Sequence, residues 1–379
     1  MKKLLIILLI FILLILVSFF FSPKYLQNAL IYQTPDIDDY QIFNNREVEA
    51  GNYIPWDSAV DYNKKELSKA TIQRIDSLLP VAFLVVQNGK LKYEKYWNEY
   101  SDSSLSNSFS MAKSIISLLI GIAIDDGLIK SVDQPVADFI EEFNTKENKN
   151  LKVKDLLTMS SGLNWDEHYS SPFSLTTQAY YGEDLRTLIK ELNVIEPSGE
   201  KWNYLSGNTQ LLALVLEKAC GTSVSEFASK KLWKPIGAKN PALWSMDNPE
   251  GTEKAYCCFN SNARDFARIG QLILNEGMYD DIQVVSKAFL DSATRAANYL
   301  KDERGNSVDF YGYQFWIVNY KGYRIPFARG ILGQYIFVIP GKNAVVVRLG
   351  HKRSESRTIK PEMPDDVYLY LEAAMEVLD

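Results

Sequence analysis

The stretch Ser110-Met111-Ala112-Lys113 marks the point where a polar, serine-rich segment (101–108) turns into an apolar run that starts at Ile115. This change predicts a helix from Met111 to Asp125. Residues three apart share a helix face, so the Lys113 amine can reach the Ser110 hydroxyl. Burial beside the apolar run lowers the pKa of a lysine amine, which makes it a usable base. We therefore predict a serine nucleophile with its base; the alternative is an N-cap serine followed by a solvated lysine.

Strand signals lie on both sides of this helix. Before it, Val81–Val86 and Leu91–Tyr96 are joined by Asn88-Gly89, a strong hairpin signal. After it, strands are predicted over 311–318, 334–339 and 344–349, and helices over 67–79, 153–159, 185–192, 209–219, 224–232, 263–275 and 364–377. Strands at both ends with helices between them predict an α+β fold. In this fold the N- and C-terminal strands form one antiparallel sheet, with flanking helices and a large, mainly helical insertion.

The N-terminus carries a membrane signal. Lys2 and Lys3 precede Leu4–Phe21, eighteen residues that are all apolar except Ser18. Such a segment forms about 27 Å of helix, close to the thickness of a bilayer core. Residues 1–22 are therefore predicted to be a transmembrane signal anchor. A cleaved signal peptide is the alternative, which the long apolar run and the poor cleavage site disfavour.

The lysines also predict the orientation of the anchor, because positive charge favours the cytoplasmic side. The chain is then a single-pass protein of the cytoplasmic membrane whose catalytic domain lies on the extracytoplasmic side. Residues 23–63 contain Pro and Asp with weak periodicity, and they are predicted to form a stalk that wraps the domain. Residues 64–379 are predicted to form the catalytic domain itself, a length that is ample for a large core.

An acyl-transfer enzyme needs a second proton carrier besides the base. Tyr204 lies between a Pro-Ser-Gly turn and a predicted helix, so its ring can project from a loop. Near Lys113, its phenol can relay a proton to the leaving group. The alternative is a buried tyrosine with a purely structural hydrogen bond.

The same chemistry needs backbone donors for an oxyanion. Gly330 and Gly333 permit close approach of the backbone, so the N–H of Ile331 is a predicted donor, and the helix start at Ser110 supplies another. Arg329 or Arg324 is predicted to pair with a substrate carboxylate. The alternatives are a β-bulge for the glycines and solvated surface charges for the arginines.

Other functions have little support in the composition. His168 and His351 are the only histidines and show no metal-ligand spacing, so neither a metal nor a cofactor is predicted. A net charge of −6 without a basic run argues against nucleic-acid binding. Cys257 and Cys258 are adjacent, so at most one is expected to pair with Cys220, and burial of all three as small apolar residues is the favoured prediction.

Together these motifs resemble the serine β-lactamase and penicillin-binding-protein superfamily, especially its 6-aminohexanoate-dimer hydrolase type. Ser110-x-x-Lys113 is similar to the nucleophile motif, Tyr204 to the tyrosine of the second motif, and Gly330–Tyr335 to the third-motif strand. Two features depart from the class C β-lactamases. Tyr204-Leu205-Ser206 stands where they have Tyr-x-Asn, and no Lys-[Ser/Thr]-Gly precedes the final strands, which argues against efficient β-lactam hydrolysis.

The resemblance implies roles for these residues. Ser110 is acylated, Lys113 and Tyr204 move the protons, and the N–H groups of Ser110 and Ile331 form the oxyanion hole. Arg329 and Gly330 belong to a segment that resembles the 6-aminohexanoate-dimer hydrolase type. Trp165 and Tyr169, on the loop after Gly162, are expected to be walls of the substrate pocket, or alternatively to pin that loop.

We therefore predict a membrane-anchored serine hydrolase of the β-lactamase/transpeptidase-like fold. It is expected to cleave an amide or ester bond in a small-molecule or peptide-like substrate through an acyl-enzyme, without a metal or cofactor. One alternative is a non-catalytic protein that recognises penicillin or cell-wall peptide; another is a D,D-peptidase acting on peptidoglycan. The sequence predicts no oligomeric state.

Overall fold

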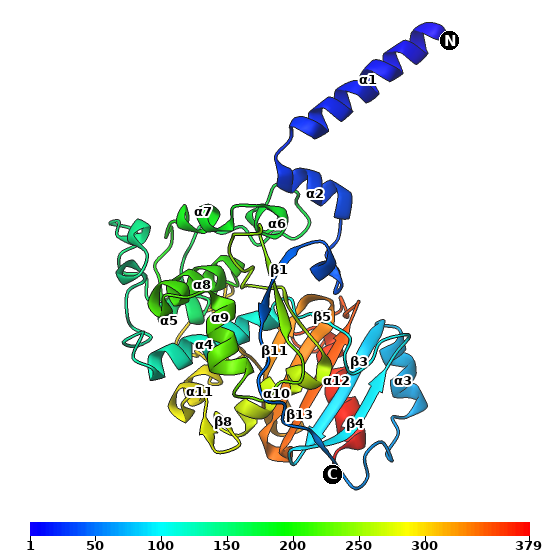
Figure 1. Cartoon of the computed structure of the whole chain (residues 1–379), viewed down its shortest axis with the longest axis vertical. Helices are drawn as coiled ribbons and strands as arrows, with labels where there is room; N and C mark the ends of the chain where they lie inside the picture. The colour runs from blue at the N-terminus through cyan, green and yellow to red at the C-terminus, as the bar shows by residue number, and fades with distance from the viewer.

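A seven-stranded sheet forms the centre of the computed structural model, which describes residues 1–379. Its order is β10-β11-β12-β13-β3-β4-β2, and all neighbouring strands are antiparallel except β2 and β4. The bounds are β2 (Asp57–Ser58), β3 (Pro80–Gln87), β4 (Lys90–Tyr96), β10 (Trp316–Tyr320), β11 (Tyr323–Gly330), β12 (Gln334–Ile339) and β13 (Ala344–Gly350). The N-terminal strand β3 pairs with the C-terminal strand β13 (Figure 1). The predicted α+β fold is thus confirmed.

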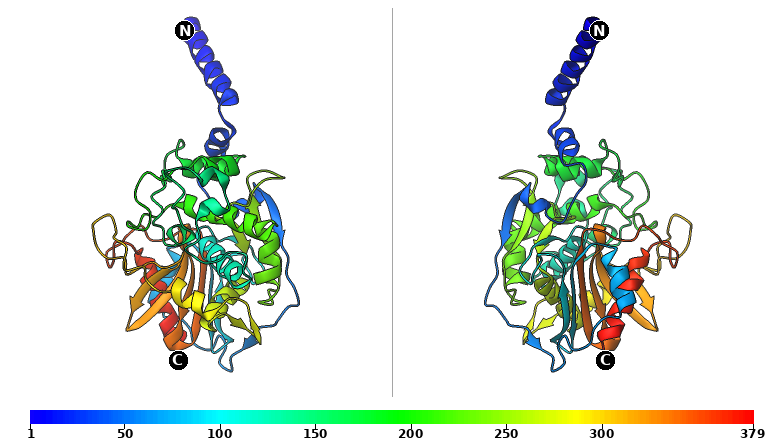
Figure 2. Two further views of the ribbon diagram at one scale, coloured as in Figure 1. Left: turned by 90° about the vertical axis from the view of Figure 1, so that its left-hand side faces the viewer. Right: turned by 90° about the vertical axis from the view of Figure 1, so that its right-hand side faces the viewer.

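Helices cover both faces of this sheet (Figure 2). Helices α3 (Lys69–Asp76) and α12 (Asp365–Val377) pack together on one face, and α10 (Ala263–Leu274) and α4 (Met111–Asp125) contact strands from the other. Strand β3 contributes side chains to the hydrophobic cores on both faces of the sheet: Phe83 belongs to one core and Leu84 to the other. Successive side chains of a strand point to opposite faces, so a sheet covered on both sides needs an unbroken apolar run.

A second, mainly helical lobe is inserted between β4 and β10. Its helices besides α4 and α10 are α5 (Val153–Leu157), α6 (Leu175–Tyr181), α7 (Leu185–Lys190), α8 (Ser206–Cys220), α9 (Val224–Ala228) and α11 (Lys287–Ala293). Two small sheets were not predicted. The first has the order β1-β6-β7-β5, with β1 (Asn44–Val48), β6 (Ala242–Met246), β7 (Phe259–Ser261) and β5 (Ser106–Asn107). The second is a hairpin of β8 (Met278–Tyr279) and β9 (Ile282–Gln283). Strands of two to five residues are too short to give a clear alternation signal.

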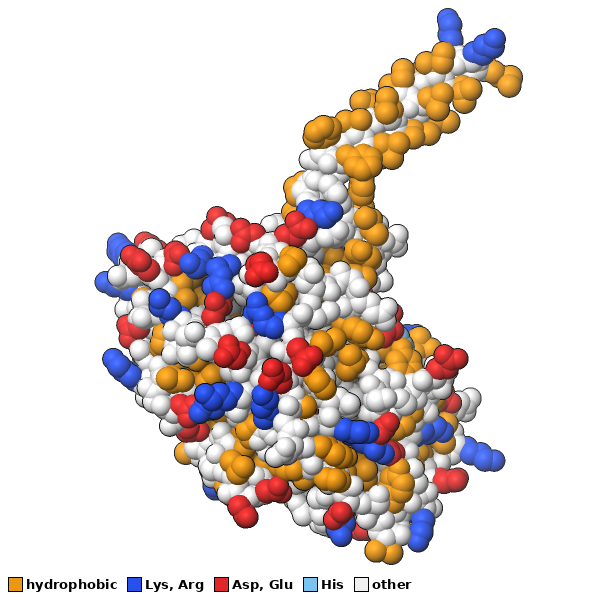
Figure 3. Space-filling model, in the orientation of Figure 1, with side chains coloured by type: hydrophobic (Ala, Val, Ile, Leu, Met, Phe, Trp, Pro, Cys, Tyr) orange, Lys and Arg blue, Asp and Glu red, His pale blue; other side chains and the backbone are white.

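The N-terminal helix α1 (Lys2–Phe21) projects from the body of the protein, and none of its residues is buried. It is long and apolar enough to cross a membrane, and Figure 3 shows hydrophobic side chains along it with lysines at its free end. Helix α2 (Lys24–Tyr32) follows and packs on α6. Strands β1 and β2 also come from residues 23–63, so this segment lies along the domain and contributes to two of its sheets.

The prediction for the cysteines is right about the burial of Cys257 and Cys258, but it misses a bond between them, and Cys220 is only half-buried. Cys257 and Cys258 form a disulfide with each other, and Cys220 is free. Cys220 ends α8, whereas the adjacent pair lies directly before β7. Cys258 adopts a positive φ of 68°, so the chain turns sharply between the two side chains. A turn of this kind cannot be inferred from the spacing of the cysteines.

Candidate active site

Ser110 directly precedes α4 at the junction of the two lobes. Its side chain caps no backbone N–H group of that helix, so the N-cap alternative does not describe it. The preceding residue, Phe109, has a φ of +44°, a conformation that costs a bulky side chain on the order of 1–3 kcal/mol. The Phe109 N–H donates to Asn107 Oδ1 at 2.9 Å, which helps to hold the turn. The sharp turn leaves the Ser110 hydroxyl facing a cavity rather than the helix.

Lys113 lies one turn further along α4 and is 1 % exposed. Its Nζ is 3.1 Å from Ser110 Oγ, 3.1 Å from Ser206 Oγ and 2.8 Å from the carbonyl oxygen of Tyr256. Burial lowers the pKa of this amine from 10.5 to about 8, while the negative charge of Glu167 acts in the opposite direction. The structure thus brings together a serine hydroxyl and an amine that is partly unprotonated near neutral pH.

Tyr204 stands in the loop before α8, on the other side of the amine. Lys113 Nζ is 5.3 Å from the centroid of its ring. Burial raises the pKa of the Tyr204 phenol well above its usual value, and a hydrogen bond with Ser110 acts against that rise. The phenol therefore stays protonated at neutral pH. It touches both Ser110 and the surroundings of Lys113, as a proton relay requires.

Gly330 brings the end of β11 close to the serine. A Cβ atom on this residue would lie 2.2 Å from the carbonyl oxygen of Ser108, a distance that no side chain allows. Only glycine therefore permits this approach. The next residue, Ile331, lines the same two cavities as Ser110. The predicted oxyanion donors, the N–H groups of Ser110 and Ile331, thus lie on neighbouring segments, and their role remains a prediction.

Glu167 and Ser206 form part of the site that the sequence reasoning did not assign. Glu167 accepts hydrogen bonds from the Ser206 N–H and the Ser206 hydroxyl, both at 2.6 Å, and from the indole N–H of Trp165 at 2.7 Å. The Tyr169 hydroxyl donates to the same carboxylate. A chain of hydrogen bonds thus runs from Ser110 through Lys113 and Ser206 to Glu167. The sequence does contain one indication of a role for Ser206: it is the third residue of Tyr204-Leu205-Ser206, the segment that is similar to the second motif of the family.

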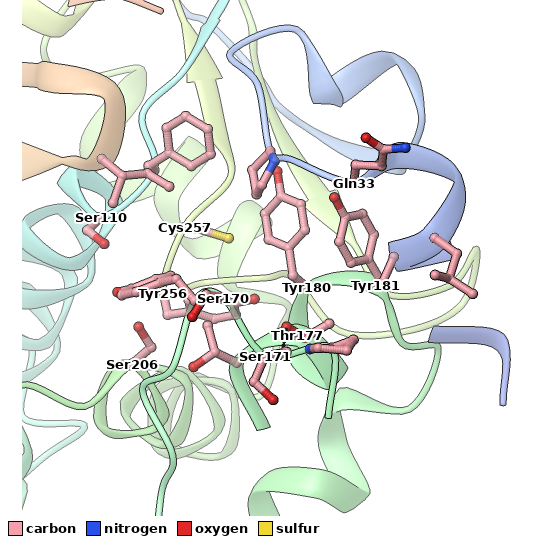
Figure 4. A pocket seen from close by; sticks show the side chains of 18 residues that line it. Gln33, Ser110, Ser170, Ser171, Thr177, Tyr180, Tyr181, Ser206, Tyr256 and Cys257 are labelled. Atoms are coloured by element: carbon pink, nitrogen blue, oxygen red, sulfur yellow. Dashed lines mark hydrogen bonds between the residues drawn. The ribbon is translucent and has the colours of Figure 1, made fainter. Parts of the chain in front are cut away.

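Two cavities meet at Ser110, and Ser110, Tyr169 and Ile331 line both. The first, which we call the apolar cavity, has a volume of about 370 Å³ and extends toward α2 and α6 (Figure 4). The second, the arginine cavity, has about 460 Å³. The arginine cavity is lined by Arg304, Arg329, Arg353 and Arg357, with Trp202, Tyr204, Phe310 and Trp316 among the aromatic residues.

The guanidinium groups of the arginine cavity differ in their partners. Arg304 is paired with Asp302 and Glu362. Arg329 lies over the Trp316 ring, 3.4 Å from its centroid, and donates to the carbonyl oxygen of Glu362 at 2.7 Å. Burial and the nearby charge of Arg353 lower the pKa of Arg329 to about 10. No carboxylate forms a salt bridge with Arg329, Arg353 or Arg357. The four arginines outnumber the three carboxylates of the lining, Asp302, Glu303 and Glu362, by one charge.

Of the remaining residues predicted for the site, Tyr169 lines the cavities, whereas Trp165 and Arg324 do not. Tyr169 is 55 % exposed and lines both cavities. Trp165 is buried and lines neither cavity; its ring packs so closely on Gly207 that a Cβ there would lie 2.6 Å away. This contact matches the alternative in which Trp165 pins the loop. Arg324 lies away from both cavities, with its side chain donating to the Thr294 carbonyl oxygen.

Comparison with known proteins agrees with this architecture. A 6-aminohexanoate-dimer hydrolase of Paenarthrobacter ureafaciens is 26 % identical over 292 residues, which cover 73 % of this chain and 74 % of that protein. A Bacillus anthracis structure, provisionally assigned as a 6-aminohexanoate-dimer hydrolase, superposes with a TM-score of 0.73 at 20 % identity and covers 90 % of this chain and 92 % of that one. A penicillin-binding protein from Bacillus halodurans gives a TM-score of 0.60 at 15 % identity, covering 80 % and 99 %.

The profile of the Beta-lactamase family matches residues 69–362. This range begins at α3 and ends shortly before α12, so it contains Ser110, Lys113 and Tyr204 and nearly all of the central sheet. Hydrolases are found among its relatives. The matched range together with the shared fold shows that this chain is a member of the beta-lactamase family.

Proposed function

We propose that this chain is a membrane-anchored serine hydrolase that cleaves an amide or ester bond through an acyl-enzyme on Ser110. The observation that carries the proposal is the 3.1 Å contact between Ser110 Oγ and the buried Lys113 amine. A binding protein has no need of a base beside a hydroxyl group. At any pH well below 8, a pKa of about 8 instead of 10.5 leaves about 300-fold more of the amine unprotonated.

In the acylation step, the Ser110 oxygen attacks the carbonyl carbon while its proton moves to Lys113, directly or through Tyr204. The oxyanion that forms is stabilised by the N–H groups of Ser110 and Ile331, each donor of this kind contributing roughly 3–4 kcal/mol in well-studied hydrolases. The carbonyl carbon then loses its bond to the leaving group, which takes a proton from Tyr204. The products of this step are the acyl-enzyme and a free alcohol or amine.

Deacylation follows the same route in reverse, with water in place of the leaving group. Water gives a proton to the Lys113–Tyr204 pair as its oxygen attacks the acyl carbon, and Ser110 regains its proton when the acid departs. Ser206 and Glu167 do not touch the reacting atoms. They hold Lys113 in position, since the Ser206 hydroxyl accepts one proton of its ammonium group.

The arginine cavity supports a leaving group with negative charge. Tyr204, the proton donor in this mechanism, lines the arginine cavity and not the apolar one, so the leaving group lies on that side. Arg353 forms no salt bridge with the protein. A carboxylate or phosphate on the leaving group would pair with the guanidinium groups of Arg353 and Arg329, which line the same cavity.

The membrane part of the proposal rests on α1. It has 20 residues, and no part of it packs on the domain. An apolar helix of this length is stable inside a bilayer and poorly soluble outside one. Its two flanking lysines favour a cytoplasmic N-terminus, which would place the hydrolase domain on the other side of the membrane.

The test is the intact mass of the full chain in detergent after incubation with a fluorophosphonate, for wild type and Ser110→Ala. The proposal predicts one covalent adduct in wild type and none in the variant. It also predicts hydrolysis of 4-nitrophenyl acetate that depends on Ser110. A folded wild-type chain that forms no adduct would contradict the proposal and favour a ligand-binding protein.

A further inference from the structure

The apolar cavity is the part of the site that the mechanism leaves unused. None of its 18 lining residues is charged, whereas seven charged residues line the arginine cavity. With the leaving group near Tyr204, the acyl part of the substrate extends from Ser110 into the apolar cavity. Its volume of about 370 Å³ lies within the range of small-molecule sites. An uncharged cavity of this kind accepts a hydrocarbon group and offers no partner of opposite charge to an ion.

The far wall of the apolar cavity is the helix that follows the membrane segment. Ala29 and Leu30 of α2 line it, together with Gln33, which directly follows that helix. Figure 4 shows Ser110 at one end of the cavity and Gln33 at the other, with Tyr180 and Tyr181 of α6 between them. The cavity therefore leads from the nucleophile to a wall formed by α2 and α6.

Side-chain hydrogen bonds fix α2 to both of its neighbours. The Gln27 amide donates to the carbonyl oxygen of Ser22, at the end of α1, at 2.9 Å. The Asn28 amide donates to the carbonyl oxygen of Tyr181, at the end of α6, at 3.0 Å. The end of α1, the helix α2 and the wall of the cavity are thus connected by direct contacts.

The distance from the bilayer to the cavity is short. Only Ser22 and Pro23 lie between Phe21, the last residue of α1, and Lys24, the first of α2, so the Cα atoms of Phe21 and Lys24 lie at most about 11 Å apart. The headgroup layer on one side of a membrane is about 5–8 Å deep, so α2 begins within this layer or just outside it. Phe20 and Phe21 are 71 % and 86 % exposed, and Leu30 and Ile31 of α2 are each 59 % exposed. With α1 in the bilayer, the exposed apolar side of α2 lies at the membrane surface.

We infer that the acyl group of the substrate is the hydrocarbon chain of an ester or amide that resides in the bilayer, and that this chain lies in the apolar cavity beside α2 when its carbonyl carbon is at Ser110; this rests on the proposed function. The covalent chemistry is unchanged. The Ser110 oxygen forms a bond to the acyl carbon, the bond to the head group breaks, Tyr204 protonates the head group, and water later releases the chain as a carboxylic acid. The polar head group then occupies the arginine cavity.

The experiment compares acyl chain lengths in the full chain reconstituted in phosphatidylcholine vesicles. The probes are 4-nitrophenyl acetate, butanoate, hexanoate and octanoate. A fully buried methylene raises kcat/KM by about fourfold, equivalent to about 0.8 kcal/mol. Because the cavity is open on one side, we expect a smaller effect per methylene and a rise of at least about thirtyfold from acetate to octanoate.

Leu30→Asp and Ile31→Asp form a matched pair. Both residues are 59 % exposed on α2, but only Leu30 lines the apolar cavity. Leu30→Asp is expected to reduce the octanoate-to-acetate ratio at least about fivefold, because an aspartate at the rim disfavours the chain. Ile31→Asp is expected to keep the wild-type ratio. The two variants introduce the same charge at equally exposed, adjacent positions of α2, so partitioning of the ester into the vesicle is expected to affect both alike. Ala29→Phe, which fills the cavity without a charge, serves as a second variant that should also lower the ratio.

Delivery from the bilayer has its own readout. 4-Nitrophenyl palmitate placed in the same vesicles as the enzyme should be hydrolysed at least about tenfold faster than the same ester in separate vesicles. A flat chain-length series, equal ratios in the Leu30 and Ile31 variants, or equal rates from same and separate vesicles would overturn the inference. In those cases Ser110-dependent hydrolysis of the acetate would leave the proposed function intact, whereas loss of all Ser110-dependent hydrolysis would refute the proposed function instead.

Discussion

Glu167→Gln should shift the pH at which the enzyme becomes active. Lys113 must be unprotonated to accept the Ser110 proton, so kcat/KM should rise with pH through the pKa of Lys113, about 8. The Glu167 carboxylate stabilises the ammonium form and raises that pKa. Its removal therefore lowers the pKa, and the rising limb of the profile moves to lower pH.

The size of the shift follows from the geometry. Hydrogen bonds of 3.1 and 2.6 Å connect Lys113 Nζ to Glu167 through the Ser206 hydroxyl, so the two charges lie within about 5.7 Å of each other. At an effective dielectric constant of about 20 their interaction is worth about 3 kcal/mol. Glu167 is partly exposed, and solvent screening reduces this value by roughly half. The remaining ~1.5 kcal/mol corresponds to a shift of about one pH unit.

The assay is kcat/KM for 4-nitrophenyl acetate from about pH 6 to about pH 10, corrected for spontaneous hydrolysis. The rate of inactivation by a fluorophosphonate, measured over the same pH range, should show the same rising limb of the pH profile, and this measurement does not require turnover. Glu191→Gln is the matched control, because it removes the same charge from an exposed position that does not affect the pKa of Lys113. A limb that stays in place or moves to higher pH in Glu167→Gln would refute the electrostatic role given to this carboxylate.

Three further changes have definite expected outcomes. Ser206→Ala removes one acceptor of the Lys113 ammonium, worth about 1.5–3 kcal/mol, and should lower kcat roughly ten- to hundredfold with little change in KM for the acetate ester. Arg353→Gln removes a charge without a salt-bridge partner from the arginine cavity. It should lower the ratio of kcat/KM for 2-carboxy-4-nitrophenyl butanoate to that for 4-nitrophenyl butanoate about fivefold, which competition assays with the two esters would measure. Gly330→Ala places a Cβ against the Ser108 carbonyl oxygen and should cost about 1–3 kcal/mol in urea unfolding; unchanged stability would show that β11 can move away from Ser108.

Much of the fold was predictable because its long elements carry strong periodic signals. The hairpin over Asn88-Gly89 is present with positive φ at both residues, and α4 has the predicted bounds. Strand β11 was not recognised as a strand, although its end at Gly330 was singled out. It contains Pro326 and Arg324, which weaken the alternation on which strand prediction depends.

The site was predictable where the chain carries a local motif and unpredictable where distant segments meet. Ser110 and Lys113 share one helix turn, and their contact follows from helix geometry. Glu167 lies 54 positions from Lys113 in the chain, and nothing in its neighbourhood distinguishes it from a surface acid until the loop folds over the start of α8. The wall that α2 contributes to the apolar cavity was missed for the same reason, since residues 23–63 were predicted to be a stalk that wraps the domain and not part of the site.

The distribution of charge in the site bears on the pKa that Lys113 would have with the proposed anionic leaving group bound. A carboxylate or phosphate near Tyr204 would by itself stabilise the Lys113 ammonium and suppress its action as a base. The guanidinium groups of Arg329, Arg353 and Arg357 oppose that effect, because they lie in the same cavity as the anion. Arg329 comes from the end of β11, and Arg353 and Arg357 come from the segment after β13. With no charge in the apolar cavity, Glu167 is left as the one carboxylate that sets the pKa of the base.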